Sequence, residues 1–179
     1  MLIFMDANIV QLVADYEDFV FGLISGYDGG APTIDQRLLK ELEALQTLFY
    51  WEQVGDGWLY PATPGLMKEL CERKPGEKLT REQERVYEGF LKAWQDHGAA
   101  EFPLDEKNVD IAERPLMDIK FKDLPDRRHV ADAIVLGADY FLTNDGEMIS
   151  KSKQANLPFR VRRPSECIHE MLRGLFLYT

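Results

Sequence analysis

The chain has 179 residues, enough for one domain with a full hydrophobic core, and its 45% apolar and 29% charged residues are the balance of an ordinary globular protein. Its formal net charge of −10 counts against a broad basic surface for nucleic acid, and it contains no run of the roughly 20 apolar residues that cross a bilayer. The apolar residues 1–5 are too short for a signal-peptide core, so we expect a cytoplasmic protein without a membrane partner, with Cys71 and Cys167 as reduced thiols.

The first third of the chain predicts a buried strand and then helices. Residues 2–5 form a continuous apolar run, which is typical of a strand buried on both faces of a parallel sheet. Asp6 follows at its end, and we expect a helix directly after it. Leucines at helical spacing predict a further helix over residues 34–50. We interpret residues 14–52 as a helical insertion.

The middle of the chain is less regular. Residues 58–61 fit a short strand, and Thr63-Pro64 fits a helix cap with proline in the first turn of a helix that carries Glu69. An apolar stripe at helical spacing predicts another helix over residues 80–98. Residues 99–124 are interrupted by prolines and predict a short strand or an irregular segment.

The last third of the chain has the clearest pattern. A helix is expected over residues 126–136, ended by Gly137, because glycine readily adopts the left-handed conformation that terminates helices. Strands are expected over residues 139–143 and 159–162, and Pro164 begins a final helix.

This alternation of strands and helices predicts one domain over residues 1–179 with an α/β fold. We expect a three-layer α/β/α sandwich around a central, mostly parallel sheet, which is a Rossmann-like arrangement. Ligands of such sheets bind beyond the carboxyl ends of the strands.

Acidic residues occur where that edge is expected. Asp6 and Asp145 each follow a strand, Asp126 begins a helix, and Glu69 lies about one and a half turns into another helix. Carboxylates that converge repel one another unless a cation neutralises them, and hard oxygen ligands favour Mg²⁺ or Mn²⁺. Taken singly, each aspartate also fits a helix cap or a turn.

Other titratable residues lie close in sequence to Glu69 and Asp126. Glu72, three residues after Glu69, is an alternative to it. Asp132 is six residues after Asp126, about 600° further round a helix, so we expect it to point away and to be structural. His129 is one turn after Asp126 and is expected to support the site or to pack rather than to bind metal.

The C-terminal part contains a run from Asp126 through His129 and Gly137 to Thr143-Asn144-Asp145. This run resembles the C-terminal signature of the PIN domain family of nucleases. The opening strand with Asp6-Ala7-Asn8 is similar to the first motif of that family. The segments that resemble its second motif and its closing strand and helix are Met67-Lys68-Glu69-Leu70 and residues 159–168.

The resemblance implies an endoribonuclease that cleaves RNA phosphodiester bonds with Mg²⁺ or Mn²⁺ and a metal-activated water. It implies that the metal-binding and catalytic residues are Asp6, Glu69, Asp126 and Asp145. Asn8 and Thr143 would orient these ligands. Many members of the family are toxins, so the expected partners are RNA, an antitoxin-like protein and a second copy of the chain.

Basic residues gather in the same part of the chain as two of the acids. Residues 120–179 hold ten Lys/Arg and eight Asp/Glu, whereas the rest of the chain is strongly acidic. Arg127 and Arg128, next to Asp126, are the candidates for binding the RNA backbone. A solvated basic face is the equally weighted alternative.

Other functions fit the sequence less well. A PIN-like scaffold that binds RNA or a protein without cleaving is the main alternative. A receiver-type signalling domain would have a pair of acids after the first strand, where only Asp6 stands. A phosphohydrolase with an aspartyl nucleophile would have a second aspartate at the position of Asn8.

Overall fold

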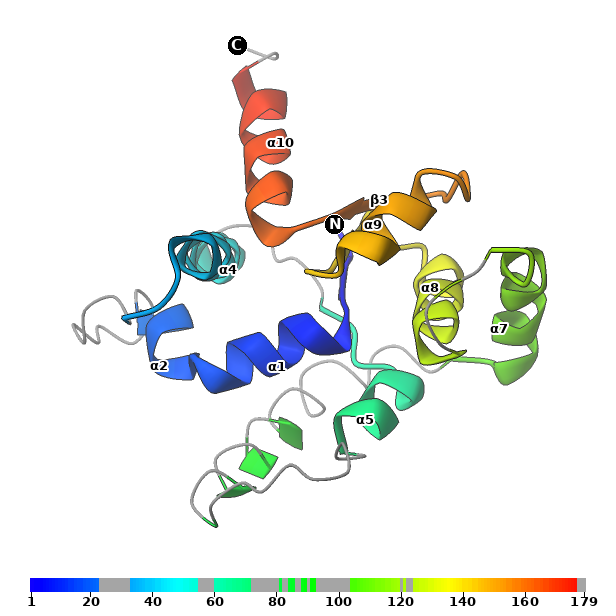
Figure 1. The fold of residues 1–179 in the computed structure, drawn as a ribbon, viewed down its shortest axis with the longest axis horizontal. Coiled ribbons are helices and arrows are strands. Elements are labelled where there is room, and N and C mark those ends of the chain that lie inside the picture. The colour runs from blue at the N-terminus through cyan, green and yellow to red at the C-terminus, as the bar shows by residue number, and fades with distance from the viewer. Residues whose placement is uncertain are drawn as a thin grey trace.

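The computed structural model of the chain describes residues 1–22, 33–54, 60–71, 104–119, 121 and 124–176, together with residues 81, 84, 85, 88, 89, 91 and 92. Within these residues the fold is α/β, with a three-stranded sheet and helices around it (Figure 1). None of the described helices is both long enough and apolar enough to cross a membrane.

The sheet consists of β1 (Ile3–Met5), β2 (Tyr140–Leu142) and β3 (Arg160–Arg162), in that order and all parallel. Phe4 pairs in register with Phe141, which pairs with Val161. Every residue of β1 and β2 is buried, as the continuous apolar runs predict for strands covered on both faces. The prediction of a parallel sheet is therefore confirmed.

Helices cover both faces of this sheet. On one face, the Phe4 and Phe141 rings stack with their centroids 5.2 Å apart, and the Phe4 ring lies 6.1 Å from the His129 ring of α8 (Leu124–Leu136). On the other face, the Tyr140 hydroxyl accepts a hydrogen bond from Arg160, which also pairs with Glu170 of α10 (Pro164–Phe176). The strands thus lie between α8 and α10.

The remaining helices pack around these two. α4 packs against α10 and α2, α5 against α1 and α8, and α7 against α8 (Figure 1). Their bounds are α1 (Ala7–Asp15), α2 (Glu17–Val20), α4 (Gln36–Val54), α5 (Pro64–Cys71), α7 (Glu106–Glu113), the 3-10 turn η1 (Arg114–Leu116) and α9 (Gly146–Ser152).

Gly137 ends α8 as predicted. Its φ of +69° is left-handed, a conformation that costs glycine nothing because it has no Cβ. The amide of Ala138 bonds to the carbonyl of Ala133 at 3.0 Å, and that of Gly137 to the carbonyl of Ile134 at 3.1 Å. This pair of bonds satisfies carbonyls at the helix end and turns the chain into β2.

Residues 99–124 differ from their prediction. The described part of this segment contains α7 and η1, not a strand. Asp105 caps α7 by accepting from the amide of Lys107 at 3.0 Å. Pro115 does not interrupt this helix, because it lies at the start of η1, where a missing N–H costs little.

Two other predicted elements fall partly outside the described residues. Tyr60 and Pro61 are in neither helix nor strand, so the strand expected over residues 58–61 is wrong at these two positions; residues 58 and 59 lie outside the described part. All described residues between 81 and 92 are helical, in agreement with the helix expected over 80–98. Glu72, the alternative to Glu69, also lies outside the described residues.

Candidate metal centre

Asp6 lies at the carboxyl end of β1 and is 3% exposed. Its amide donates to the carbonyl of Leu142 at 3.0 Å, which extends the pairing of β1 with β2 by one residue. Its side chain then caps α1, since Oδ1 accepts from the amide of Ala7 at 2.9 Å. The order of strand, aspartate and helix in the sequence thus fixes this carboxylate at the edge of the sheet.

The Asp6 carboxylate is satisfied entirely by protein donors. Besides the Ala7 amide, Oδ1 lies 3.4 Å from His129 Nδ1. Oδ2 accepts from Asn8 Nδ2 at 2.5 Å and from the Thr143 hydroxyl at 2.7 Å. A carboxylate offers about four acceptor positions, so each has a donor, and these charge-assisted bonds offset the cost of burying the charge.

Thr143 connects Asp6 to Asp145. The Thr143 Oγ1 atom accepts from Asn8 Nδ2 and from the amide of Asp145, each at 3.0 Å. Asp145 caps α9, because its Oδ1 accepts from the amides of Glu147 at 2.7 Å and Met148 at 3.3 Å. The acids after β1 and β2 therefore lie at neighbouring strand ends with one hydroxyl between them.

His129 connects Asp6 to Glu69. The ring is 1% exposed, with Nδ1 3.4 Å from Asp6 Oδ1 and Nε2 3.3 Å from Glu69 Oε2. Burial lowers the pKa of His129, but the hydrogen bond to Asp6 and the charges of Asp6, Glu69 and Asp132 outweigh it and raise the pKa above its ordinary value. The two carboxylates therefore favour the protonated form of the ring that lies between them.

Asp126 and Asp132 occupy different surroundings on α8. Asp126 is half-buried in the first turn, three residues before His129, which places the two side chains on the same side of the helix. Asp132 is 2% exposed and its Oδ2 accepts from the Thr63 hydroxyl at 2.8 Å. Burial raises the pKa of Asp132, opposed by Thr63 and by the charges of His129 and Arg128. The bond from Thr63 thus joins Asp132 of α8 to the residue before α5.

The donor atoms fit a hard divalent cation in kind, but the structure does not gather them around one point. Among the described residues, no three His, Cys, Asp or Glu side chains lie close enough to hold one ion. A cation at Asp6 must replace one of its four donors, of which His129 is the most distant. The second oxygen of Asp145 has no hydrogen-bond donor within the described part of the chain.

A cavity of about 440 Å³ opens beside this network, between α5 and α8. His129 and Glu69 form part of its wall, so it gives access to one end of the network. The residues that line it are Gly65, Lys68, Glu69, Glu113, Leu124, Pro125, Arg127, Arg128 and His129.

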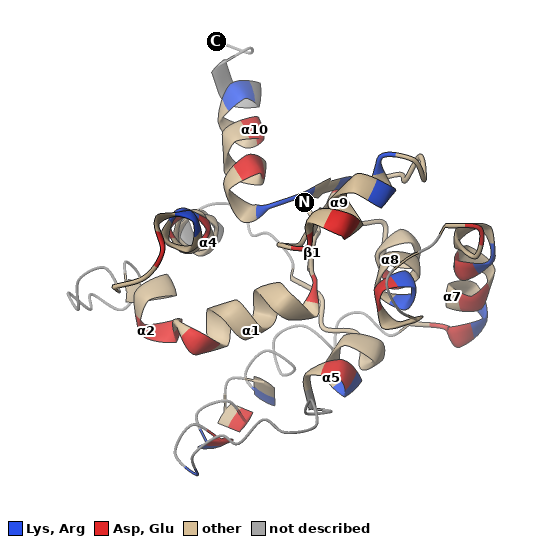
Figure 2. Ribbon diagram, viewed as in Figure 1, with Lys and Arg blue, Asp and Glu red and all other residues tan. Residues whose placement is uncertain are grey.

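The two arginines proposed to bind RNA line this cavity but are paired with acids of α7. Arg127 Nε lies 2.7 Å from Glu113 Oε1. Arg128 lies 3.2 Å from Glu113 Oε2 and 2.7 Å from Asp110 Oδ1, and it also pairs with Glu106. Figure 2 shows α7 and α8 side by side with acidic and basic segments on both. The sequence analysis missed these acids, although Glu106, Asp110 and Glu113 are spaced as one face of a helix.

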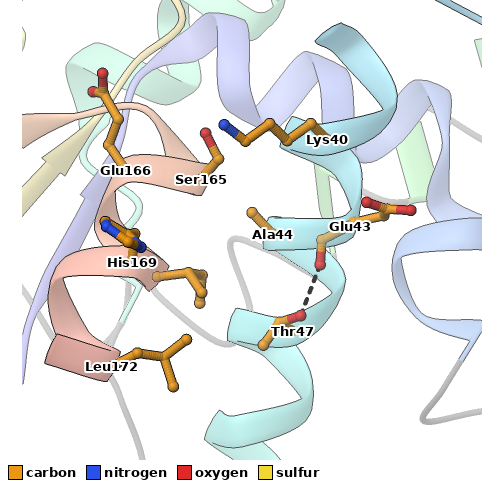
Figure 3. Close-up of a pocket in the computed structure, with 9 residues that line it drawn as sticks. Lys40, Glu43, Ala44, Thr47, Ser165, Glu166, His169 and Leu172 are labelled. Carbon is orange, nitrogen blue, oxygen red and sulfur yellow. Dashed lines mark hydrogen bonds between the residues drawn. The ribbon is translucent and has the colours of Figure 1, made fainter. Parts of the chain in front are cut away.

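A second cavity, of about 470 Å³, lies between α4 and α10. Figure 3 shows Lys40, Ala44 and Thr47 of α4 facing Ser165, His169 and Leu172 of α10, with the Thr47 hydroxyl donating to the Glu43 carbonyl at 2.8 Å. None of the four predicted acids is among the described residues that line it. It is therefore separate from the candidate site.

No family model, curated protein or solved structure matches this chain. The arguments for its function therefore rest on the geometry of the described residues and on the sequence motifs.

Proposed function

We propose that this chain is a metal-dependent endoribonuclease with the acid arrangement of PIN domains. The observation that supports it is one connected network at the carboxyl edge of the sheet. The Asp6 carboxylate bonds to the Thr143 hydroxyl, which accepts from the backbone amide of Asp145. Asp6 also lies beside His129, whose Nε2 is 3.3 Å from Glu69 Oε2. Asp126 precedes His129 by about one helical turn. Asp6, Glu69 and Asp145 thus belong to one network, and Asp126 lies on the helix that carries His129.

In this proposal Asp6, Glu69, Asp126 and Asp145 hold Mg²⁺ or Mn²⁺. The cation, when bound, supplies a water of lowered pKa and neutralises charge on the phosphodiester. The chain's own contribution is positioning. Thr143 and Asn8 fix the orientation of the Asp6 carboxylate, and the cap on α9 fixes Asp145. Antitoxin-like and homodimeric partners stay predictions of the family resemblance.

The test is cleavage of a pool of single-stranded and structured RNA with Mn²⁺ or Mg²⁺, compared with EDTA. The informative variant is Asp145→Asn, because asparagine caps helices as well as aspartate and preserves the fold. We expect metal-dependent cleavage by the parent and a loss of at least about 100-fold in the variant, since a carboxylate that holds the metal contributes several kcal/mol.

The matched control is Asp105→Asn, which also changes an aspartate that caps a helix, here α7. It loses the same charge and likewise keeps an oxygen that caps the helix, but it does not belong to the network, so its cleavage rate should stay near that of the parent. Equal rates for the two variants, or cleavage that persists in EDTA, would contradict the proposal.

One observation favours the second candidate, a PIN-like scaffold that binds without cleaving. All four acceptor positions of Asp6 already have protein donors, as expected of a site that needs no cation. Titration of Mn²⁺ followed by electron paramagnetic resonance separates the two. Loss of the free Mn²⁺ signal on the parent but not on Asp145→Asn supports the nuclease, and no loss on either supports the scaffold.

A further inference from the structure

We infer that Glu113 of α7 occupies the position on Arg127 and Arg128 that an RNA phosphate takes when substrate binds. The inference rests on the proposed function, because it names how that site meets its substrate. When RNA binds, its phosphates replace the Glu113 carboxylate on the two arginines. The acidic α7 is in this way a built-in competitor of the substrate.

Glu113 is the acid that joins both arginines. Its Oε1 lies 2.7 Å from Arg127 Nε and its Oε2 lies 3.2 Å from Arg128 Nη1. The Glu113 side chain is 15% exposed, against 20% for Arg127 and 25% for Arg128. The three charged side chains are therefore largely shielded from water. An ion pair in such a place is stronger than one on an open surface.

Two other acids that pair with Arg128, Glu106 and Asp110, are more open to water, whereas the buried Asp132 Oδ1 lies farther away, 3.9 Å from Arg128 Nε. The side chains of Glu106 and Asp110 are 73% and 61% exposed. Exposed ion pairs contribute little and are screened by salt, so these two exchange readily with an incoming anion. Glu113 is consequently the main carboxylate that RNA must displace.

The chemistry of guanidinium groups allows this exchange. Their planar array of donors binds the paired oxygens of a carboxylate and of a phosphate in the same manner. Arg127, Arg128 and Glu113 all line the cavity of about 440 Å³ that also contains Glu69 and His129. A phosphate on these arginines would thus enter the cavity that leads to the acidic network.

The exchange does not require α7 to leave α8. Val109 of α7 is fully buried, and Leu116 of η1 is 3% exposed. These buried side chains help to hold the helix in place independently of Glu113. Only the Glu113 side chain needs to move.

The experiment compares Glu113→Gln with Glu43→Gln, a matched control. Glu43 is exposed on α4 beside the second cavity, so both changes remove one negative charge from a protein of net charge −10. Binding of a fluorescein-labelled single-stranded polyuridine is measured by anisotropy in EDTA over a series of salt concentrations. Circular dichroism checks that each variant is folded.

We expect Glu113→Gln to bind more tightly than the parent and the control, because RNA then has no carboxylate to displace from the arginines. Adding Arg127→Gln and Arg128→Gln to the Glu113→Gln protein should remove this gain. It should also lower the slope of log Kobs against log salt by roughly 1.4, since each phosphate neutralised on a single strand contributes about 0.7. The triple variant also keeps the test valid if the single change perturbs α7.

An equal affinity for Glu113→Gln and Glu43→Gln overturns the inference, as does an absence of binding in all variants. These binding measurements do not depend on cleavage. If Glu113→Gln gains affinity but no variant cleaves RNA, the binding surface stands and the nuclease proposal fails. If the parent cleaves RNA and Glu113→Gln gains no affinity, the nuclease proposal stands and this inference fails.

Discussion

Thr143 is the residue that joins the two strand-end acids. Its buried hydroxyl donates to Asp6 at 2.7 Å and accepts from Asn8 and from the Asp145 amide, each at 3.0 Å. A buried carboxylate that loses a donor destabilises the fold, because water cannot reach it to replace the lost hydrogen bond. The Thr143 hydroxyl oxygen thus contributes both to the stability of the fold and to the geometry of the site.

We expect Thr143→Val to lower the free energy of unfolding by about 2–3 kcal/mol, because valine keeps the shape but leaves a buried carboxylate oxygen and an amide without their partner. Urea denaturation measures this loss. Thr47→Val is the control, since the Thr47 hydroxyl makes one local bond to the Glu43 carbonyl on an exposed stretch of α4. Equal losses for the two variants would show that the Thr143 hydroxyl stabilises the fold no more than an ordinary local hydrogen bond does.

At this scale the sequence predicted part of the site. The family resemblance implied that Asn8 and Thr143 orient the acids, and in the structure both side chains bond to Asp6 and to each other. The insertion of His129 between two carboxylates was not predictable, because it depends on the rotation of α8 against α5. The rotation of one helix against another is set by tertiary packing, and the spacing of residues within one helix does not predict it.

The close approach of α5 to α8 shows how that rotation is maintained. Gly65, the second residue of α5, has no side chain to separate the helices, and a Cβ there would lie 3.2 Å from Asp132 Oδ2. That oxygen is fixed by the Thr63 hydroxyl at 2.8 Å, so it cannot easily move aside. Gly65 therefore sets the spacing on which the contact between Glu69 and His129 depends.

We expect Gly65→Ala to lower the free energy of unfolding by about 1 kcal/mol, the lower end of the cost of overpacking. The control is Gly89→Ala, because Gly89 is helical and a Cβ there meets nothing within 4 Å. Alanine favours a helix over glycine by about 0.8–1 kcal/mol, so this control should gain stability. Thermal denaturation of both variants gives the comparison, and a gain at Gly65 equal to that at Gly89 would contradict the spacing argument.

Elements with strong local signals were predicted and those with weak ones were not. The strand at residues 3–5 and the end of α8 at Gly137 follow from an apolar run and a left-handed glycine. α7 was missed because its apolar contacts, Val109 and Leu116, are few and a proline follows it. Its stability comes from packing on α8 and from ion pairs with Arg128, which are properties of the folded chain.

For the molecule as a whole, Cys167 reports on the integrity of the core. It is fully buried on α10, and burial, with the charge of Glu170, raises the pKa of its thiol to about 12. Only the thiolate reacts with alkylating reagents, so the folded protein protects this group both by access and by ionisation.

We expect Cys167, in a Cys71→Ser variant that leaves it as the single thiol, to react with iodoacetamide orders of magnitude more slowly than free cysteine in native buffer. The rate should rise only over the urea range in which the fold is lost, because reaction requires global opening. Mass spectrometry follows the modification. Rapid alkylation without urea would show that α10 opens independently of the sheet.

The order of the sheet has a consequence for synthesis on the ribosome. Among the described strands β1 pairs with β2 alone, so Ile3 has no strand partner in that sheet until Tyr140 has been translated. At typical elongation rates that interval is on the order of 10 seconds. During it, a fully apolar segment ending in Asp6 is open to chaperones or to misassociation, and the acidic network cannot exist. An abrupt slowing of translation before β2 should therefore reduce the yield of folded protein more than one placed after β3.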